Sequence, residues 1–158
     1  MQKRSDLEPS NGERVTLGRL GDFVGFRLRR IQNQLSREFA GETQRYGLRH
    51  GEFSALAIIA ANPGLSQMML AREVGLDKSA AVSVIDDLER LGFAERRRLP
   101  TDRRRYALYA TPAGEAALAA MFEKLESVEH DALDALDPSE LHLLNTLLDR
   151  IYRATFHG

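Results

Sequence analysis

Seven arginines are concentrated between Arg90 and Tyr106, in a chain whose formal net charge is only −1. Two acidic residues, Glu95 and Asp102, lie in the same stretch, so the positive charge is local and does not follow from the overall composition. Clustered guanidinium groups attract a polyanion, and a basic hairpin beside a helix is suited to holding duplex DNA. The arginine-rich segment therefore predicts contact with double-stranded DNA.

The arginines belong to a predicted β-hairpin, a wing, made of residues 93–98 and 105–110 with a turn at residues 100–102. Asp102 at its tip can accept hydrogen bonds from a neighbouring guanidinium, so we expect it to stabilise the turn. One arginine at the tip is expected to reach the minor groove, whose negative potential attracts arginine, and others are expected to contact phosphate. The arginines selected are Arg103 or Arg104 for the groove and Arg97 for phosphate.

A helix–turn–helix is predicted immediately before this hairpin. Ser66 caps a short helix over residues 67–74, which ends at Gly75. Asp77 caps the following helix, residues 78–91, and this second helix is expected to enter the major groove with its N-terminus first. The side chains at its start that are expected to contact bases or phosphates are Lys78, Ser79, Ala80 and Ser83.

The second half of the same helix carries two acids that would repel phosphate. Asp86 and Asp87 are therefore expected either to lie where the helix leaves the groove or to pair with arginines of the hairpin. The buried side of the helix is predicted to carry Val82, Ile85 and Leu88, which recur at steps of three.

Amphipathic helices are predicted on both sides of this DNA-binding segment. Residues 17–46 and 49–61 form two helices before it, and helices that begin at Thr111-Pro112 and Asp137-Pro138 follow it. The fold class is thus mainly α with a small β-wing, a winged helix–turn–helix with flanking helices. Terminal helices that expose so much leucine are expected to pair with a second copy in a homodimer. The predicted parts are a flexible tail (1–16), an N-terminal dimerisation helix (17–48), the DNA-binding domain (49–110) and C-terminal dimerisation helices (111–158).

Composition excludes several functions. The chain has no cysteine, which removes disulfides, thiolate metal sites and thiol nucleophiles. No apolar run approaches the ~20 residues that span a bilayer, and the polar N-terminus is unlike a signal peptide, so we expect a cytoplasmic protein without a membrane partner. No catalytic or phosphate-loop motif is present, so we expect no enzyme activity and no cofactor.

Four segments of the chain form a specific set when they are taken together. They are LAREVGLDKS (70–79), DDLERLGF (86–93), DRRR (102–105) and TPAG (111–114). This set resembles the MarR family of bacterial regulators. The resemblance implies a homodimeric winged-helix repressor that binds a pseudo-palindromic operator and releases it when a small aromatic acid, or its CoA thioester, binds. It also assigns DNA contacts to the start of the helix at Lys78 and to Arg103 and Arg104. The absence of cysteine excludes the peroxide-sensing branch of the family.

The effector site is weakly marked in the sequence. Phe23 and Phe26 could supply aromatic walls, and Arg30 and His50 a cationic or polar anchor, although core packing and solvation explain the same residues. A metal-responsive regulator is an alternative, because one branch of the family binds zinc and His50 lies close to Glu52. A winged helix that mediates protein–protein contact without DNA is another alternative, favoured if acids balance the arginines in space.

Overall fold

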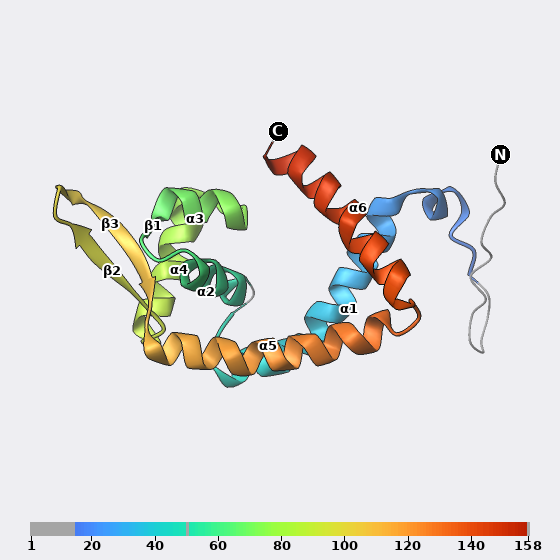
Figure 1. Ribbon diagram of the computed structural model, residues 1–158, viewed down its shortest axis with the longest axis horizontal. Helices are drawn as coiled ribbons and strands as arrows, with labels where there is room; N and C mark the ends of the chain where they lie inside the picture. The colour runs from blue at the N-terminus through green and yellow to red at the C-terminus, as the bar shows by residue number, and fades with distance from the viewer. Residues whose placement is uncertain (1–14, 50, 158) are drawn as a thin grey trace. The chain divides into compact units, whose positions relative to one another are not determined.

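The computed structural model describes residues 15–49 and 51–157, and only the backbone of Arg103 and Arg104. Its contacts form two units, Met1–Gln34 and Leu35–Gly158. Helices dominate, and a small antiparallel sheet is the other component (Figure 1), which confirms the predicted fold class of a winged helix. After a 3-10 helix at Gly18–Asp22, the elements are α1 (Val24–Arg45), α2 (Glu52–Ala61), β1 (Leu65–Ser66), α3 (Gln67–Val74), α4 (Lys78–Arg90), β2 (Ala94–Leu99), β3 (Asp102–Ala110), α5 (Pro112–Leu133) and α6 (Pro138–Phe156).

The prediction of one continuous helix from residue 17 to residue 46 is wrong at its start. A 3-10 helix covers Gly18–Asp22, and α1 begins only after Phe23, whose backbone is extended with φ −104° and ψ 123°. Gly18 adopts a φ of +52°, which an α-helix does not contain. The apolar residues recur with helical spacing on both sides of this break. That spacing shows which side of a helix is apolar, but it does not show whether the helix is continuous.

The hydrophobic core is centred on α2. This helix begins at Glu52, three residues later than predicted, because Gly51 before it has a left-handed backbone with φ +84°. Ala55, Leu56 and Ile59 on α2 are completely buried. The fully buried side chains that surround them come from α3, α4, β3 and α5, and they are Leu70, Ile85, Leu88, Leu108 and Met121.

The helix–turn–helix forms as its caps predict. The Ser66 hydroxyl accepts a hydrogen bond from the Met69 N–H (3.2 Å), and the Asp77 carboxylate accepts one from the Ala80 N–H (2.8 Å). The core side of α4 carries Ala81, Ile85 and Leu88, which are buried. Val82 was expected on this side but is only half-buried, because the helical period of 3.6 places Ala81 rather than Val82 one turn before Ile85.

The wing is a hairpin of β2 and β3, to which a third strand is added. Ala94 pairs with Ala110 and Arg98 with Tyr106, and an irregularity follows between Arg98 and Leu99. β3 begins at Asp102, three residues earlier than predicted, so the strands continue to the turn at Pro100-Thr101. β1, whose Leu65 pairs with Leu108, is not predicted from the sequence, because a strand of two residues exists only through its partner. The hairpin projects beyond α3 and α4 (Figure 1).

Two predicted helix starts after the wing are also confirmed. Thr111 caps α5 by accepting from the Gly114 N–H (3.0 Å), and Asp137 and Glu140 form a complete capping box at α6. Apolar side chains of α6 remain exposed within the described chain. They are Leu143, Leu147, Leu148, Ile151, Tyr152 and Phe156.

Candidate nucleic-acid interface

The start of α4 presents polar side chains to solvent, as the sequence analysis expected. Lys78, Ser79 and Ser83 are exposed, whereas Ala80 is half-buried and offers only part of its methyl group. Ser79 and Ser83 share an exposed stripe with Asp86 and Arg90, since these positions are separated by three or four residues. The stripe therefore begins with hydroxyl groups and continues into charged groups.

Asp86 does not stand alone on this stripe. Its carboxylate is 2.7 Å from Nη2 of Arg96 on β2, and Nη1 of Arg96 forms an ion pair with Glu89 on α4. The Arg96 backbone N–H also donates to Glu89 (2.7 Å). Arg96 is thus an arginine of the wing that pairs with acids of α4, one of the two alternatives foreseen for Asp86, and it joins β2 to the helix.

The next two arginines of β2 lie against aromatic rings of β3. Arg97 donates from Nε to Glu95 (2.6 Å), and its guanidinium lies 4.2 Å from the centre of the Tyr109 ring. The Arg98 guanidinium lies 5.8 Å from the Tyr106 ring centre. Stacking restrains these long side chains while leaving guanidinium donors accessible, and Arg97 remains 59% exposed.

The tip of the wing begins at Asp102. This residue is exposed and lies opposite Leu99 at the first position of β3. Arg103 and Arg104 follow it on the same strand, but their side chains lie outside the part of the chain that the structure describes. Their roles, and the stabilising role of Asp102, stay predictions.

Acids balance part of the arginine cluster. Of the seven arginines between residues 90 and 106, three form ion pairs with a carboxylate among the described groups. These are Arg90 with Asp87, Arg96 with Asp86 and Glu89, and Arg97 with Glu95. The acids that pair with Arg90 and Arg96 lie on α4, so these two arginines are neutralised at the base of the wing.

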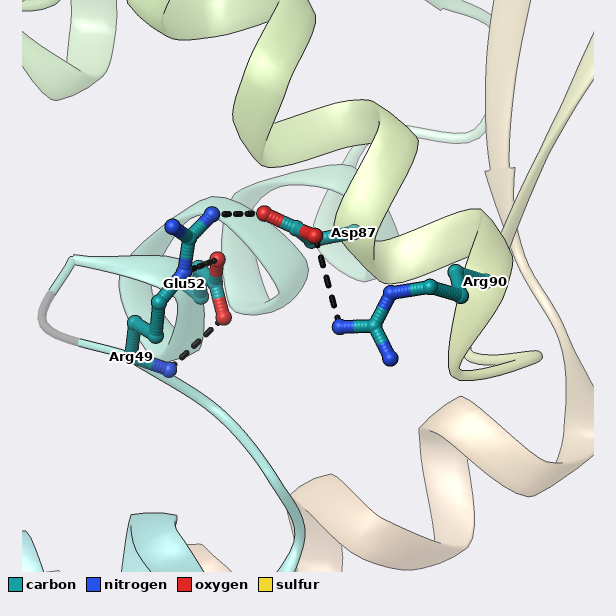
Figure 2. A network of polar contacts seen from close by, with 4 residues as sticks. All are labelled: Arg49, Glu52, Asp87 and Arg90. Atoms are coloured by element: carbon teal, nitrogen blue, oxygen red, sulfur yellow. Dashed lines mark hydrogen bonds and ion pairs between the residues drawn. The ribbon is translucent and has the colours of Figure 1, made fainter.

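A second polar network joins α4 to the segment before α2, and the sequence analysis did not find it. Figure 2 shows its four members, Arg49, Glu52, Asp87 and Arg90. Glu52 is only 1% exposed, and its carboxylate accepts from the Arg49 N–H (2.7 Å) and from Arg49 Nε (3.0 Å). Arg49 Nη2 forms an ion pair with Asp87, which also contacts Arg90 at 3.3 Å. The three-residue spacing from Arg49 to Glu52 could have indicated the ion pair between these two residues. Nothing near Arg49 in the sequence indicates its pair with Asp87.

Of the four residues predicted for an effector site, three lie in the described part of the chain, and the site stays a prediction. Phe23 and Arg30 are exposed and Phe26 is half-buried, all three in the unit Met1–Gln34, while His50 lies outside the described residues. Arg29, and not Arg30, lies over the Phe26 ring, at 5.7 Å. Elsewhere, Phe53 of α2 makes edge-to-face contacts with Phe39 and Phe122 at 4.9 and 5.2 Å between ring centres, an aromatic cluster that the sequence analysis had not selected.

The described residues contain neither a cluster of metal ligands nor a membrane-spanning helix. Within residues 15–49 and 51–157, no group of three or more His, Asp or Glu residues is placed to hold a metal ion. His50, the residue named for zinc, is outside that range. None of the helices in the described part of the chain is both long and apolar enough to cross a bilayer.

A capped helix–turn–helix followed by a basic hairpin defines the class of winged-helix proteins. Residues 46–105 match the family model for the MarR family. The chain is 39% identical over 149 residues to a protein of Thauera aromatica described as a putative transcriptional regulatory protein for the hcr operon, covering 92% of this chain and 90% of that one. This chain therefore belongs to the MarR family, whose members are regulators of transcription and not enzymes.

Solved structures agree with this assignment. The transcriptional repressor CouR, solved bound to a 23-mer DNA duplex, is 29% identical and superposes with a TM-score of 0.79, over 89% of this chain and 100% of that one. A probable transcriptional regulator from Pseudomonas aeruginosa is also 29% identical, with a TM-score of 0.73 over 84% of this chain and 99% of that one. The likeness thus extends well beyond the winged helix to the flanking helices.

Proposed function

We propose that this protein is a homodimeric repressor that binds a pseudo-palindromic DNA operator and releases it when a small aromatic acid, or its CoA thioester, binds. The observation that carries the proposal is the exposed polar start of α4 beside an arginine-rich wing, with Arg96 joining the two elements. The likeness to CouR, which was solved on DNA, supports the same use of this surface. The proposed site of action is the cytoplasm.

The two elements would divide the work on the duplex. Lys78, Ser79 and Ser83 would contact base edges or phosphates in the major groove, with the Ala80 methyl near a thymine methyl. Arg97 would hold a phosphate, one arginine of the wing tip would enter the minor groove and the other would contact phosphate, and Asp102 would stabilise the turn. The wing-tip arginines are Arg103 and Arg104.

A dimer would set the spacing between two such surfaces. Recognition helices that enter successive major grooves must lie roughly 34–36 Å apart. The exposed apolar side chains of α6, together with Val24, Leu28 and Ile31 on α1, support a second copy as their partner. A ligand that prefers another spacing by ~1–3 kcal/mol would weaken DNA binding about 5- to 150-fold.

The wing assignment is tested by salt dependence. Arg103→Ala and Arg104→Ala should each weaken binding and reduce the slope of log K against log salt by up to about one unit, because a complex that lacks one phosphate contact releases about one counterion fewer from the DNA. Ser79→Ala and Ser83→Ala should change sequence preference more than the slope. Fluorescence anisotropy over a series of salt concentrations measures both. Arg45→Ala, an exposed arginine paired with Glu42 on α1, is the control; wild-type slopes in both wing variants would refute the assignment.

The effector part of the proposal needs a separate titration. Aromatic acids and their CoA thioesters are added to a preformed complex with a duplex selected on the protein, and release of DNA is followed by anisotropy. If the affinity for DNA stays constant with every compound, control by a ligand is contradicted. The proposal that the protein binds DNA is then unaffected.

The acids that pair with Arg90, Arg96 and Arg97 favour one competing function, a winged helix used for protein contact alone. A gel shift with random duplex in low salt separates the two functions. Retarded DNA supports the repressor, because the unspecific electrostatic attraction of a DNA-binding wing is greatest in low salt.

A further inference from the structure

The segment between α1 and α2 is attached to the second half of α4 at two positions. Arg49 in this segment forms an ion pair with Asp87. Gly47 lies against Leu91, since a Cβ built on Gly47 would be 3.1 Å from Cδ2 of Leu91. Leu91 is the C-cap residue of α4 and follows Asp87 by four residues, about one helical turn. The segment and the helix are therefore held together along one turn of α4.

The attachment depends on a buried carboxylate. Glu52 is 1% exposed at the first position of α2, and a buried charge is tolerated only when it is paired and hydrogen-bonded. The Arg49 N–H and Nε both donate to it, and the N-terminal end of α2 favours a negative charge there. Two bonds to one buried group restrain an arginine that is otherwise 64% exposed.

The restrained guanidinium directs its Nη2 donor at Asp87 (Figure 2). Asp87 is 21% exposed, and its other oxygen is 3.3 Å from Arg90. A partly buried acid between two arginines is less screened by solvent than an exposed ion pair. Because its bonds to Glu52 restrain Arg49, the direction of the ion pair between Arg49 and Asp87 is restrained as well. It joins the first residue of α2 to the recognition helix.

We infer that Arg49 is a positioning residue for DNA recognition: it holds α4 by Asp87 in the orientation that presents Lys78 and Ser79 to the major groove. This inference rests on the proposed function of DNA binding. Arg49 would affect the affinity for DNA through Asp87, without touching DNA itself. A direct contact between Arg49 and phosphate is a different role with a different salt dependence.

The test compares Arg49→Ala, Asp87→Asn and the double variant, each as the full-length protein, on one duplex enriched from a random library with wild-type protein. Each single variant should bind about 2- to 30-fold more weakly, because a shifted recognition helix loses part of its groove contacts. The double variant should be no weaker than the weaker single variant, since both changes break the same link. The salt slope should equal that of wild type. Arg45→Ala, which breaks an ion pair at the same spacing on α1, should bind as wild type does.

Four results would overturn the inference. A slope reduced by about one unit in Arg49→Ala would make Arg49 a phosphate contact. Additive losses in the double variant would uncouple Arg49 from Asp87. A lower melting temperature with unchanged affinity would make the network a stabiliser of the fold only. If Arg49→Ala does not fold, Asp87→Asn carries the test, because it leaves Glu52 bonded to Arg49. If the wild-type protein binds no duplex, the proposed function is refuted as well. If the wild-type protein binds DNA and the variants bind it with the same affinity, only the inference about Arg49 is refuted.

Discussion

Gly114 explains why the TPAG segment at the start of α5 requires glycine at its fourth position. A Cβ built there would lie 2.1 Å from the carbonyl oxygen of Phe93 and 2.9 Å from its carbon. The cap residue Thr111 donates to the Gly92 carbonyl oxygen at 2.5 Å, and its N–H donates to that of Phe93 at 3.0 Å. The helix start is therefore pressed against the backbone that leads into the wing.

Gly114→Ala should destabilise the protein by more than about 1–3 kcal/mol, the usual cost of overpacking, because its neighbour here is rigid backbone. Urea unfolding at one fixed protein concentration measures the change. Gly41→Ala is the matched control. It lies within α1 with open space around its Cβ position, and it should be neutral or stabilising by up to about 1 kcal/mol. Equal stability of Gly114→Ala and wild type would contradict this packing.

At the scale of elements, the wing and α4 act as one piece because Arg96 joins them. Its guanidinium is 18% exposed and contacts both Asp86 and Glu89. Without Arg96, the negative charges of Asp86 and Glu89, three residues apart on α4, would not be compensated. They would repel each other and the phosphates of bound DNA. Arg96 therefore screens Glu89 and also Asp86, which shares a stripe with Ser79 and Ser83.

Arg96→Ala should weaken DNA binding about five-fold or more, equivalent to about 1 kcal/mol, because uncovered carboxylates repel phosphate. Adding Asp86→Asn to this variant should recover part of the loss, since it removes one of those charges. Anisotropy titrations at constant salt measure both effects. An Arg96→Ala defect that Asp86→Asn leaves unchanged would mean that Arg96 acts through the shape of the wing and not through charge.

At the scale of the whole molecule, α6 exposes apolar side chains that the proposed second copy would cover. None of its residues is buried within the described chain, although apolar side chains recur along it at steps of three and four. Such a stripe is suited to packing against another helix. The proposed dimer would cover it and at the same time duplicate the DNA-binding surface.

Ile151→Asp should convert the dimer to monomers at micromolar concentration, because it places a carboxylate in the middle of this stripe, where Ile151 is 56% exposed in the single chain. Light scattering measures the mass, and the same sample should lose tight DNA binding. Thr146→Asp adds the same charge on another side of α6 and should remain dimeric. A dimeric Ile151→Asp protein would remove α6 from the proposed interface.

Helix starts and the hairpin of the wing can be predicted from the sequence, because they depend on residues close together in the chain. Ser66, Asp77, Thr111 and Asp137 were identified as caps because a cap needs only a side-chain oxygen and the N–H groups two or three residues later. The bounds of α3 and the start of α4 followed directly, and so did the hairpin of the wing. The break at Phe23 and the strand β1 did not follow, since apolar spacing ignores helix continuity and a two-residue strand needs its neighbour β3.

The arrangement of charges was decided in three dimensions. The order of residues established that arginines gather between residues 90 and 106, but folding determined that Arg96 turns toward Asp86 and Glu89 while Arg97 stacks on Tyr109. The link from Arg49 to Asp87 likewise joins residues far apart in the chain. Ion pairs act over a few ångströms, so only packing of α2, α4 and β2 around one core determines which charges meet.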